Sequence, residues 1–70
     1  MKIRYDPEAD AISIEIKDAK IDHTKEIDMN TIVDYDKEGN AIAVELLFVS
    51  ERIPNPLKEI QIENLTKVAI

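Results

Sequence analysis

The sequence contains no cysteine among its 70 residues. Disulfides and thiolate zinc sites are therefore excluded, and nothing in the composition indicates an oxidising compartment. A chain of this length buries only about 60% of the surface that its unfolded form exposes, so a core of its own is marginal. Because cysteine cross-links cannot supply the missing stability, we expect the chain to bury further surface as a homodimer.

Long hydrophobic runs are also missing. The first ten residues, MKIRYDPEAD, carry charges where a signal peptide would be apolar. No later segment offers the roughly 20 apolar residues that a membrane-spanning helix needs. The sequence therefore predicts a soluble, cytoplasmic protein with no membrane contact.

Basic residues are outnumbered. Nine Lys and Arg face fifteen Asp and Glu, which gives a formal net charge of −6. Such a surface repels a phosphate backbone, so we expect no direct binding of nucleic acid. A basic protein partner or a cation is compatible with it, although surface acid also simply keeps a small sheet protein soluble.

The sequence does contain alternating polar and apolar residues, which are typical of β-strands with one buried face. Lys2–Tyr5 and Ala11–Lys17 show this pattern. Between them, Pro7 cannot donate a backbone hydrogen bond and Asp6 can accept from the amides that follow, which predicts a turn over residues 6–10. The two strands should pair as a hairpin.

The stretch from Thr31 to Leu47 organises the rest of the chain. It predicts a central hairpin of strands Thr31–Tyr35 and Ala41–Leu47, with Gly39 taking positive φ in the turn. Two registers stay open. A four-residue loop over residues 36–39 places Val33 opposite Ile42, and a three-residue loop with a Gly39 bulge places Ile32 opposite Val44.

The remaining segments are less regular. Residues 21–27 form a weaker strand candidate whose many charges suit a sheet edge. A short helix is expected near Phe48–Arg52 or over Pro56–Glu59, the latter with Asn55 as N-cap. Strict alternation over Glu59–Glu63 favours a fifth strand over a helix. The apolar groups of the tail, which are Leu65, Val68 and Ile70, predict that it docks on its own sheet or on a second chain.

The central turn has the ligand spacing of a calcium loop. Asp34, Asp36, Glu38 and Gly39 are followed by Glu45 at the position of the closing ligand. However, strands rather than helices flank the turn, and Glu45 lies on the order of 10 Å along its strand from the loop at ~3.3 Å per residue. We therefore expect an acidic hairpin turn, with Asp34, Asp36 and Glu38 kept only as metal candidates.

Two further places could carry chemistry. Asp6, Glu8 and Asp10 are three carboxylates that could hold a hard cation, but solvated turn residues explain them equally well. His23 has no cysteine, second histidine or serine partner that would indicate a base or a metal ligand. The residues therefore predict no catalytic group, no bound cofactor and no metal, and they favour a role other than catalysis.

Several motifs resemble a known family of small bacterial and archaeal proteins, domain of unknown function 2283. They are the opening MKIRYDPEADA, the IVDYD segment through Gly39-Asn40, and VELL with Ser50-Glu51-Arg52 after it. The resemblance covers about residues 1–53. It implies a compact α+β domain with no established activity, cofactor or catalytic residue. Some members are said to lie beside small toxin-like genes, which suggests an antitoxin role.

Taken together, these patterns predict a small, mainly β protein of the α+β class. We expect an antiparallel sheet of four or five strands with one short helix. Residues 1–53 form the sheet domain, and residues 54–70 form a C-terminal extension that packs on that domain or on a partner chain. Two functions stay open: an interaction module that neutralises a basic, toxin-like partner, and a module that binds a divalent metal or catalyses a reaction through its acidic turns.

Overall fold

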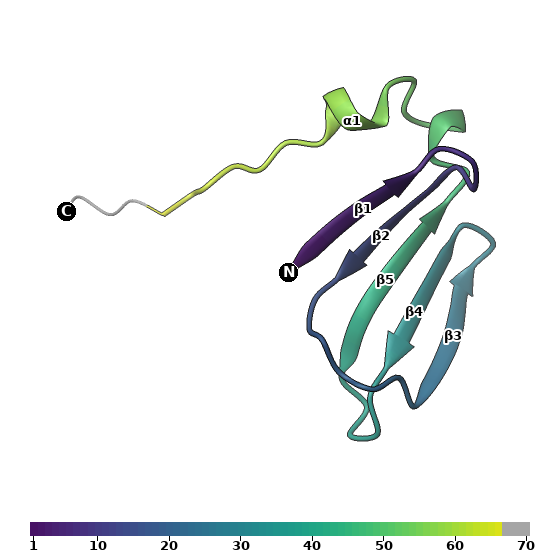
Figure 1. The fold of residues 1–70 in the computed structure, drawn as a ribbon, viewed down its shortest axis with the longest axis vertical. Helices are drawn as coiled ribbons and strands as arrows, with labels where there is room; N and C mark the ends of the chain where they lie inside the picture. The colour runs from purple at the N-terminus through teal and green to yellow at the C-terminus, as the bar shows by residue number, and fades with distance from the viewer. Residues whose placement is uncertain (67–70) are drawn as a thin grey trace.

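The computed structural model describes residues 1–66, and within them the chain forms one antiparallel sheet of five strands (Figure 1). The spatial order of the strands is β1-β2-β5-β4-β3. The predicted small, mainly β architecture is confirmed. The elements in chain order are β1 (Lys2–Asp6), β2 (Ala11–Glu15), β3 (His23–Asp28), β4 (Thr31–Tyr35), β5 (Ala41–Leu47), the 3-10 helix η1 (Val49–Glu51) and the helix α1 (Pro56–Glu59). No helix in this part of the chain has the length and apolar character to cross a membrane.

The β1–β2 hairpin forms as the alternation predicts, with Ile3 opposite Ile14 and Tyr5 opposite Ile12. Its turn is held by Asp6, whose Oδ1 accepts hydrogen bonds from the amides of Glu8 and Ala9 at 3.0 and 3.3 Å. β2 is shorter than predicted, because it ends at Glu15. The amides of the next two residues, 16 and 17, both donate to the carbonyl oxygen of Ile42 and turn the chain away.

The central hairpin forms, but neither predicted register is correct. Gly39 has φ +86° in a three-residue loop that the Asp36 amide and the Asn40 carbonyl oxygen close at 3.0 Å. A register shift between Asp34 and Tyr35 then places Val33, rather than Ile32, opposite Val44. The shift puts Val33 and Val44 on the same face of the sheet, because directly opposed residues in an antiparallel pair share a face.

The connection from β2 to β3 crosses one end of the sheet past β5 and β4 (Figure 1). It separates β2 from its sequence neighbour, so β5 pairs with β2 instead. The connection closes on β4 through a hydrogen bond of 2.8 Å from the Asp22 amide to the Tyr35 carbonyl oxygen. Next to the start of the connection lies Ile42, which is 2% exposed. The most buried apolar residues are Ala11, Ile12, Val33, Ile42 and Val49.

β3 is an edge strand, as its charges predict, and all six of its residues are exposed. It spans residues 23–28 rather than 21–27, and a register shift interrupts its pairing with β4 between Glu26 and Asp28. This exposed strand is held by its pairing with β4 on both sides of the shift, and it is the fifth strand of the sheet.

The predicted strand over Glu59–Glu63 is wrong for the single chain. Glu59 ends α1, and residues 60–66 form an extended segment without a strand partner. Both predicted helical positions are occupied, η1 near Phe48–Arg52 and α1 over Pro56–Glu59. Asn55 precedes α1 as expected, but its side chain makes no capping hydrogen bond. Of the tail residues that we expected to dock, Leu65 is 79% exposed, and Val68 and Ile70 lie outside the described residues.

Candidate functional site

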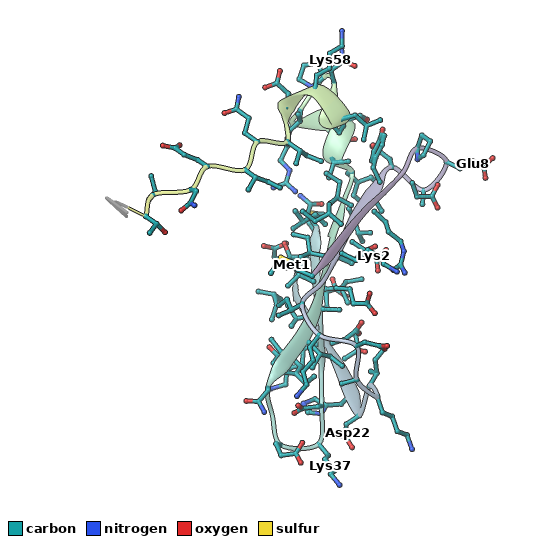
Figure 2. All side chains as sticks on the ribbon, turned by 60° about the vertical axis from the view of Figure 1, so that its left-hand side comes forward. Met1, Lys2, Glu8, Asp22, Lys37 and Lys58 are labelled. Atoms are coloured by element: carbon teal, nitrogen blue, oxygen red, sulfur yellow. The ribbon has the colours of Figure 1, made fainter. Side chains whose placement is uncertain are left out.

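The sheet has one face made of apolar side chains, here called the aliphatic face. Two rows of opposed residues across the strands define it: Ile3, Ile14, Val44 and Val33, then Tyr5, Ile12 and Leu46. The helices η1 and α1 lie beyond one end of the sheet, and residues 60–66 point away from it (Figure 1). In the nearly edge-on view of Figure 2, side chains extend from both sides of one layer of strands. No described helix therefore covers this face as a second layer would.

The exposed area is large for a chain of this mass. The accessible surface is 5814 Å². A folded monomer of 8.0 kDa is expected to expose about 4,450 Å², so the excess is about 1,350 Å². The extended tail contributes to this excess, and so does the aliphatic face, where Ile3 is 41% exposed and Ile14, Val44 and Leu46 are only half-buried. The surface is thus sufficient for the roughly 800 Å² that each partner buries in a standard interface.

The opposite, polar face carries four carboxylates on neighbouring strands, here called the acidic patch: Glu15, Glu26, Asp34 and Glu45. Glu15 and Asp34 both lie opposite Ala43, while Glu45 lies opposite Ile32, which in turn faces Glu26. Lys2 lies opposite Glu15 in the β1–β2 pair, but within residues 1–66 none of the four carboxylates forms a salt bridge with a Lys or Arg side chain. Glu26 and Glu45 in particular have no Lys or Arg directly opposite them.

The carboxylates of the calcium-type spacing make separate contacts in the structure. Asp34 points its carboxylate at the Thr24 hydroxyl, which donates to Oδ1 at 2.6 Å. Asp36 is buried and accepts at Oδ1 from the amides of Glu38 and Asn40, at 3.0 and 2.9 Å. The Asp34 carboxylate therefore links β4 to β3, whereas the Asp36 carboxylate holds the β4–β5 loop.

The hydrogen bond from the Asn40 amide is the largest cause that lowers the pKa of Asp36 below its ordinary value of 3.8. Burial opposes this effect, and the side chain of Asn40 and the amide of Glu38 add to it. An ionised Asp36 is thus built into the turn as its organising acceptor, which is a structural role.

The carboxylates of the second acidic group, Asp6, Glu8 and Asp10, also make separate contacts. Asp6 holds its own turn, whereas Asp10, with φ 52°, accepts from the Ser50 amide at 3.0 Å and from the Ser50 hydroxyl at 2.6 Å. The backbone of Asp10 accepts a further hydrogen bond from Val49 at 3.1 Å. These contacts fix η1 to the β1–β2 turn. Glu8 projects from that turn into solvent (Figure 2).

His23 lies at the β3 edge of the sheet. Its Nδ1 is 2.8 Å from Asp22 Oδ2, and its ring stacks on Tyr35 with 5.0 Å between centroids. Lys25 Nζ lies 5.5 Å from the centroid of the same Tyr35 ring. The imidazole therefore extends the aromatic end of the sheet, and with Asp22 it belongs to no group of three or more metal-ligand side chains among the described residues.

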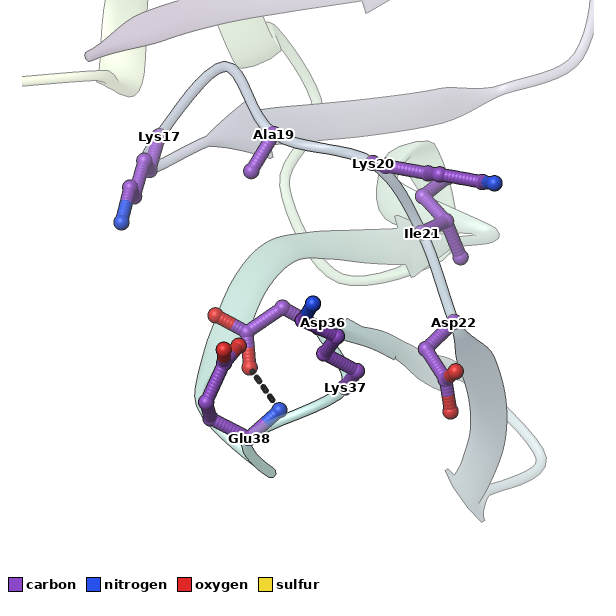
Figure 3. Close-up of a pocket in the computed structure, with 8 residues that line it drawn as sticks. All are labelled: Lys17, Ala19, Lys20, Ile21, Asp22, Asp36, Lys37 and Glu38. Carbon is purple, nitrogen blue, oxygen red and sulfur yellow. Dashed lines mark hydrogen bonds between the residues drawn. The ribbon is translucent and has the colours of Figure 1, made fainter.

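A pocket of about 490 Å³ opens between the β2–β3 connection and the β4–β5 loop (Figure 3). Lys17, Lys20 and Asp22 line it from the connection, and Asp36, Lys37 and Glu38 from the loop. Figure 3 shows the Asp36 carboxylate turned to the Glu38 amide rather than into the opening. Across residues 1–66 no three His, Asp or Glu side chains lie together as a metal-binding group. The pocket is thus a surface hollow of mixed charge.

Comparison with known proteins identifies the family to which the chain is similar. A family model described as "Protein of unknown function (DUF2283)" matches residues 2–50 of the 70-residue chain. The resemblance seen in the sequence motifs is therefore confirmed. No curated protein and no solved structure matches the chain significantly.

Proposed function

Because the chain belongs to the DUF2283 family of proteins of unknown function, we propose its function from its own geometry: it is a protein–protein interaction module that forms a homodimer through the aliphatic face. The observation that carries the proposal is a single-layer sheet whose apolar side no described helix covers. Domains bury such a face against a second layer. In the proposed dimer a second copy is that layer.

A second copy fits the face better than an unrelated apolar partner for two reasons. The face is self-complementary in chemistry, because its rows of branched aliphatic residues can interdigitate with those of a second sheet at about 10 Å separation. The excess accessible area, about 1,350 Å² with the tail included, is also larger than the roughly 800 Å² that each subunit buries in a standard interface. A two-fold arrangement uses the same surface on both copies and closes without further chains.

Light scattering and sedimentation of the full chain test the dimer. We expect a dimer at micromolar concentrations, and the variant Ile14→Lys should shift it to monomer because a charge would be buried in the middle of the face. The change Ile21→Lys, at a residue 52% exposed in the β2–β3 connection, is the matched control and should leave the dimer intact. Circular dichroism checks that both variants fold, and Ile14→Ala replaces Ile14→Lys if the latter does not. A wild-type monomer at every concentration would refute the proposal.

We further propose that the polar face serves a different, basic partner protein, as an antitoxin-like module would. The acidic patch supports this second proposal, because four carboxylates lie on neighbouring strands of one face and none of them forms a salt bridge within residues 1–66. Electrostatic attraction of this kind gives fast association that weakens as salt rises.

The alternative of a divalent-metal or enzymatic module rests on the acidic turns, and their carboxylates lie in separate hydrogen-bonded turns. Titration with calcium, magnesium or manganese decides it, since a bound ion raises the melting temperature.

A further inference from the structure

Residues 60–66 have the sequence of a strand but no strand beside them. Ile60 and Ile62 alternate with Gln61 and Glu63, and the segment is extended in the structure. Ile62 is 89% exposed and Leu65 is 79% exposed. Aliphatic groups this exposed lose the free energy that burial would supply, about 25 cal/mol per Å². The segment therefore has the features of a strand that pairs with another strand when one is present.

The sheet offers an open edge of matching chemistry at β1, which pairs with β2 on one side only. On the aliphatic side this edge presents Ile3 and Tyr5, and on the polar side it presents Lys2 and Arg4. Backbone donors and acceptors on the outer side of an edge strand are free to pair with an added strand.

We infer that the segment Ile60–Leu65 of one copy adds as a strand to the β1 edge of a second copy, with the two copies exchanging these segments reciprocally. This inference rests on the proposed homodimer and adds the contact that directs its assembly. The added strand is antiparallel to β1. With Ile60 beside Tyr5 and Ile62 beside Ile3, alternation places Gln61 beside Arg4 and Glu63 beside Lys2. In this one placement, apolar side chains lie beside apolar ones on one face of β1, and Glu63 lies beside a basic side chain on the other face.

The other edge, β3, does not fit the segment. On its polar side β3 presents Thr24 and Glu26, and on its aliphatic side it presents His23 and Lys25, with the exposed Ile27 at the register shift. In an antiparallel placement Ile60 and Ile62 would lie beside Lys25 and His23, with Glu63 beside Asp22. Shifted by two residues, they would lie beside Ile27 and Lys25, with Glu63 beside Thr24, so neither placement gives Glu63 a cation. Like charges directly opposite each other destabilise a strand pair. Charge complementarity therefore selects β1.

A second copy, rather than the same chain, is the partner. The chain leaves α1 beyond the β1 edge and points away from its own sheet (Figure 1). The segment runs on the β1 side of the sheet but forms no strand pair with its own β1 (Figure 1). The single glycine of the sequence is Gly39, and residues 57–66 contain no proline that would help to redirect the chain after α1. The extended path instead carries the segment outward, where a second subunit can accept it.

Mixed cysteine variants test the exchange directly, since the chain has no cysteine of its own. One full-length chain carries Ile3→Cys, and a second, size-tagged chain carries Ile60→Cys or Ile62→Cys. After mild oxidation we expect a disulfide between the two chains for at least one tail variant, because neighbouring strands bring Cβ atoms to about 5 Å. The control partner carries Ile27→Cys on β3, which is exposed on the other edge, and should give little product.

Charge reversal gives a second, independent readout in the full chain. Glu63→Lys should raise the dimer dissociation constant by about threefold, which is typical of an exposed ion pair. Adding Lys2→Glu and Arg4→Glu to the same chain should restore it to within about twofold, as a coupled pair requires. In the control, Glu59→Lys is combined with the same two changes, and the dissociation constant of that variant should not return to the wild-type value.

The outcomes separate this inference from the proposed dimer. Interchain disulfides formed with Ile3→Cys but not with Ile27→Cys, together with charge rescue, support the exchange. Equal products with both partners, or none in a protein that still sediments as a dimer, overturn the exchange and leave the dimer standing. A chain carrying both Ile3→Cys and Ile62→Cys that forms only an intrachain disulfide also overturns it. A protein that is monomeric at every concentration overturns both proposals.

Discussion

Asp36 organises the β4–β5 loop through its carboxylate, which accepts from two backbone amides and, at 3.3 Å, from the side chain of Asn40. These bonds favour the ionised form and lower its pKa below 3.8. A carboxyl group whose pKa is lower in the folded state adds stability above its ordinary pKa and loses it as the pH falls through the folded value. The loop should therefore weaken below about pH 4.

The change Asp36→Asn tests this because it keeps an acceptor oxygen but removes the charge. We expect a lower melting temperature near neutral pH and a smaller further loss between about pH 5 and pH 2 than in the wild type. Glu38→Gln is the control, since that exposed carboxylate accepts no hydrogen bond within the described chain. Thermal unfolding followed by circular dichroism across this range measures both. An identical pH profile for Asp36→Asn and wild type would contradict the assignment.

At the residue scale, local chemistry was predictable and distant contacts were not. Asp6 and Gly39 act as their types suggest, because a turn is decided within a few residues. Asp10 was a metal candidate in the sequence, but its partner is Ser50, 40 residues further along the chain. Only a positive φ hinted at its role, and that appears in the structure rather than in the sequence.

At the scale of elements, η1 is joined to the sheet mainly through Asp10. Asp10→Ala removes the acceptors of two hydrogen bonds from Ser50 at an exposed site and should lower the free energy of unfolding by about 1–2 kcal/mol. Ser50→Ala removes only the hydroxyl bond and should cost about half as much. Urea unfolding measures the change, and hydrogen exchange at the Val49 amide should quicken in Asp10→Ala.

The control for this anchor is Glu8→Ala in the same turn, whose side chain is exposed and accepts no hydrogen bond within residues 1–66. It should leave stability within about 0.5 kcal/mol of wild type. An Asp10→Ala variant as stable as Glu8→Ala would mean that η1 is held by Val49, which is 1% exposed, and not by the carboxylate.

The elements themselves show where alternation is sufficient. Thr31–Tyr35 and Ala41–Leu47 were predicted with correct bounds, because each has a neighbour to pair with. The strict alternation of Glu59–Glu63 predicts a strand equally well, yet this segment has no neighbour within the chain. Period-two patterning shows that a segment can be a strand, whereas pairing decides whether it is one. Strand order followed from the β2–β3 crossover, which no local pattern encodes.

At the scale of the whole molecule, the sheet separates its chemistry between two faces, and the candidate surfaces follow from that separation. The parity of the strands was visible in the sequence, so the aliphatic face could be anticipated. The acidic patch could not, because Glu15, Glu26, Asp34 and Glu45 come from four strands whose order depends on the crossover. Net charge alone, −6, gave its sign but not its place.

The location of the charge makes the proposed basic partner testable with balanced variants. The patch variant carries Glu15→Gln, Glu26→Gln and Glu45→Gln, and the control carries Glu8→Gln, Glu51→Gln and Glu59→Gln. Each set removes three negative charges, so both proteins have a net charge of −3 instead of −6. Any difference between them reports the position of the carboxylates and not their number.

Binding to the product of an adjacent gene, co-expressed and purified, is the measurement. The patch variant should bind about 10-fold more weakly at low salt, since several exposed pairs of up to about 1 kcal/mol each are lost, while the control stays near wild type. Raising salt from about 0.05 to 0.5 M should weaken the wild-type complex strongly and the patch-variant complex much less, because the charges that salt screens are already gone. Equal losses in both variants, or binding indifferent to salt, would place the contact elsewhere than on the polar face.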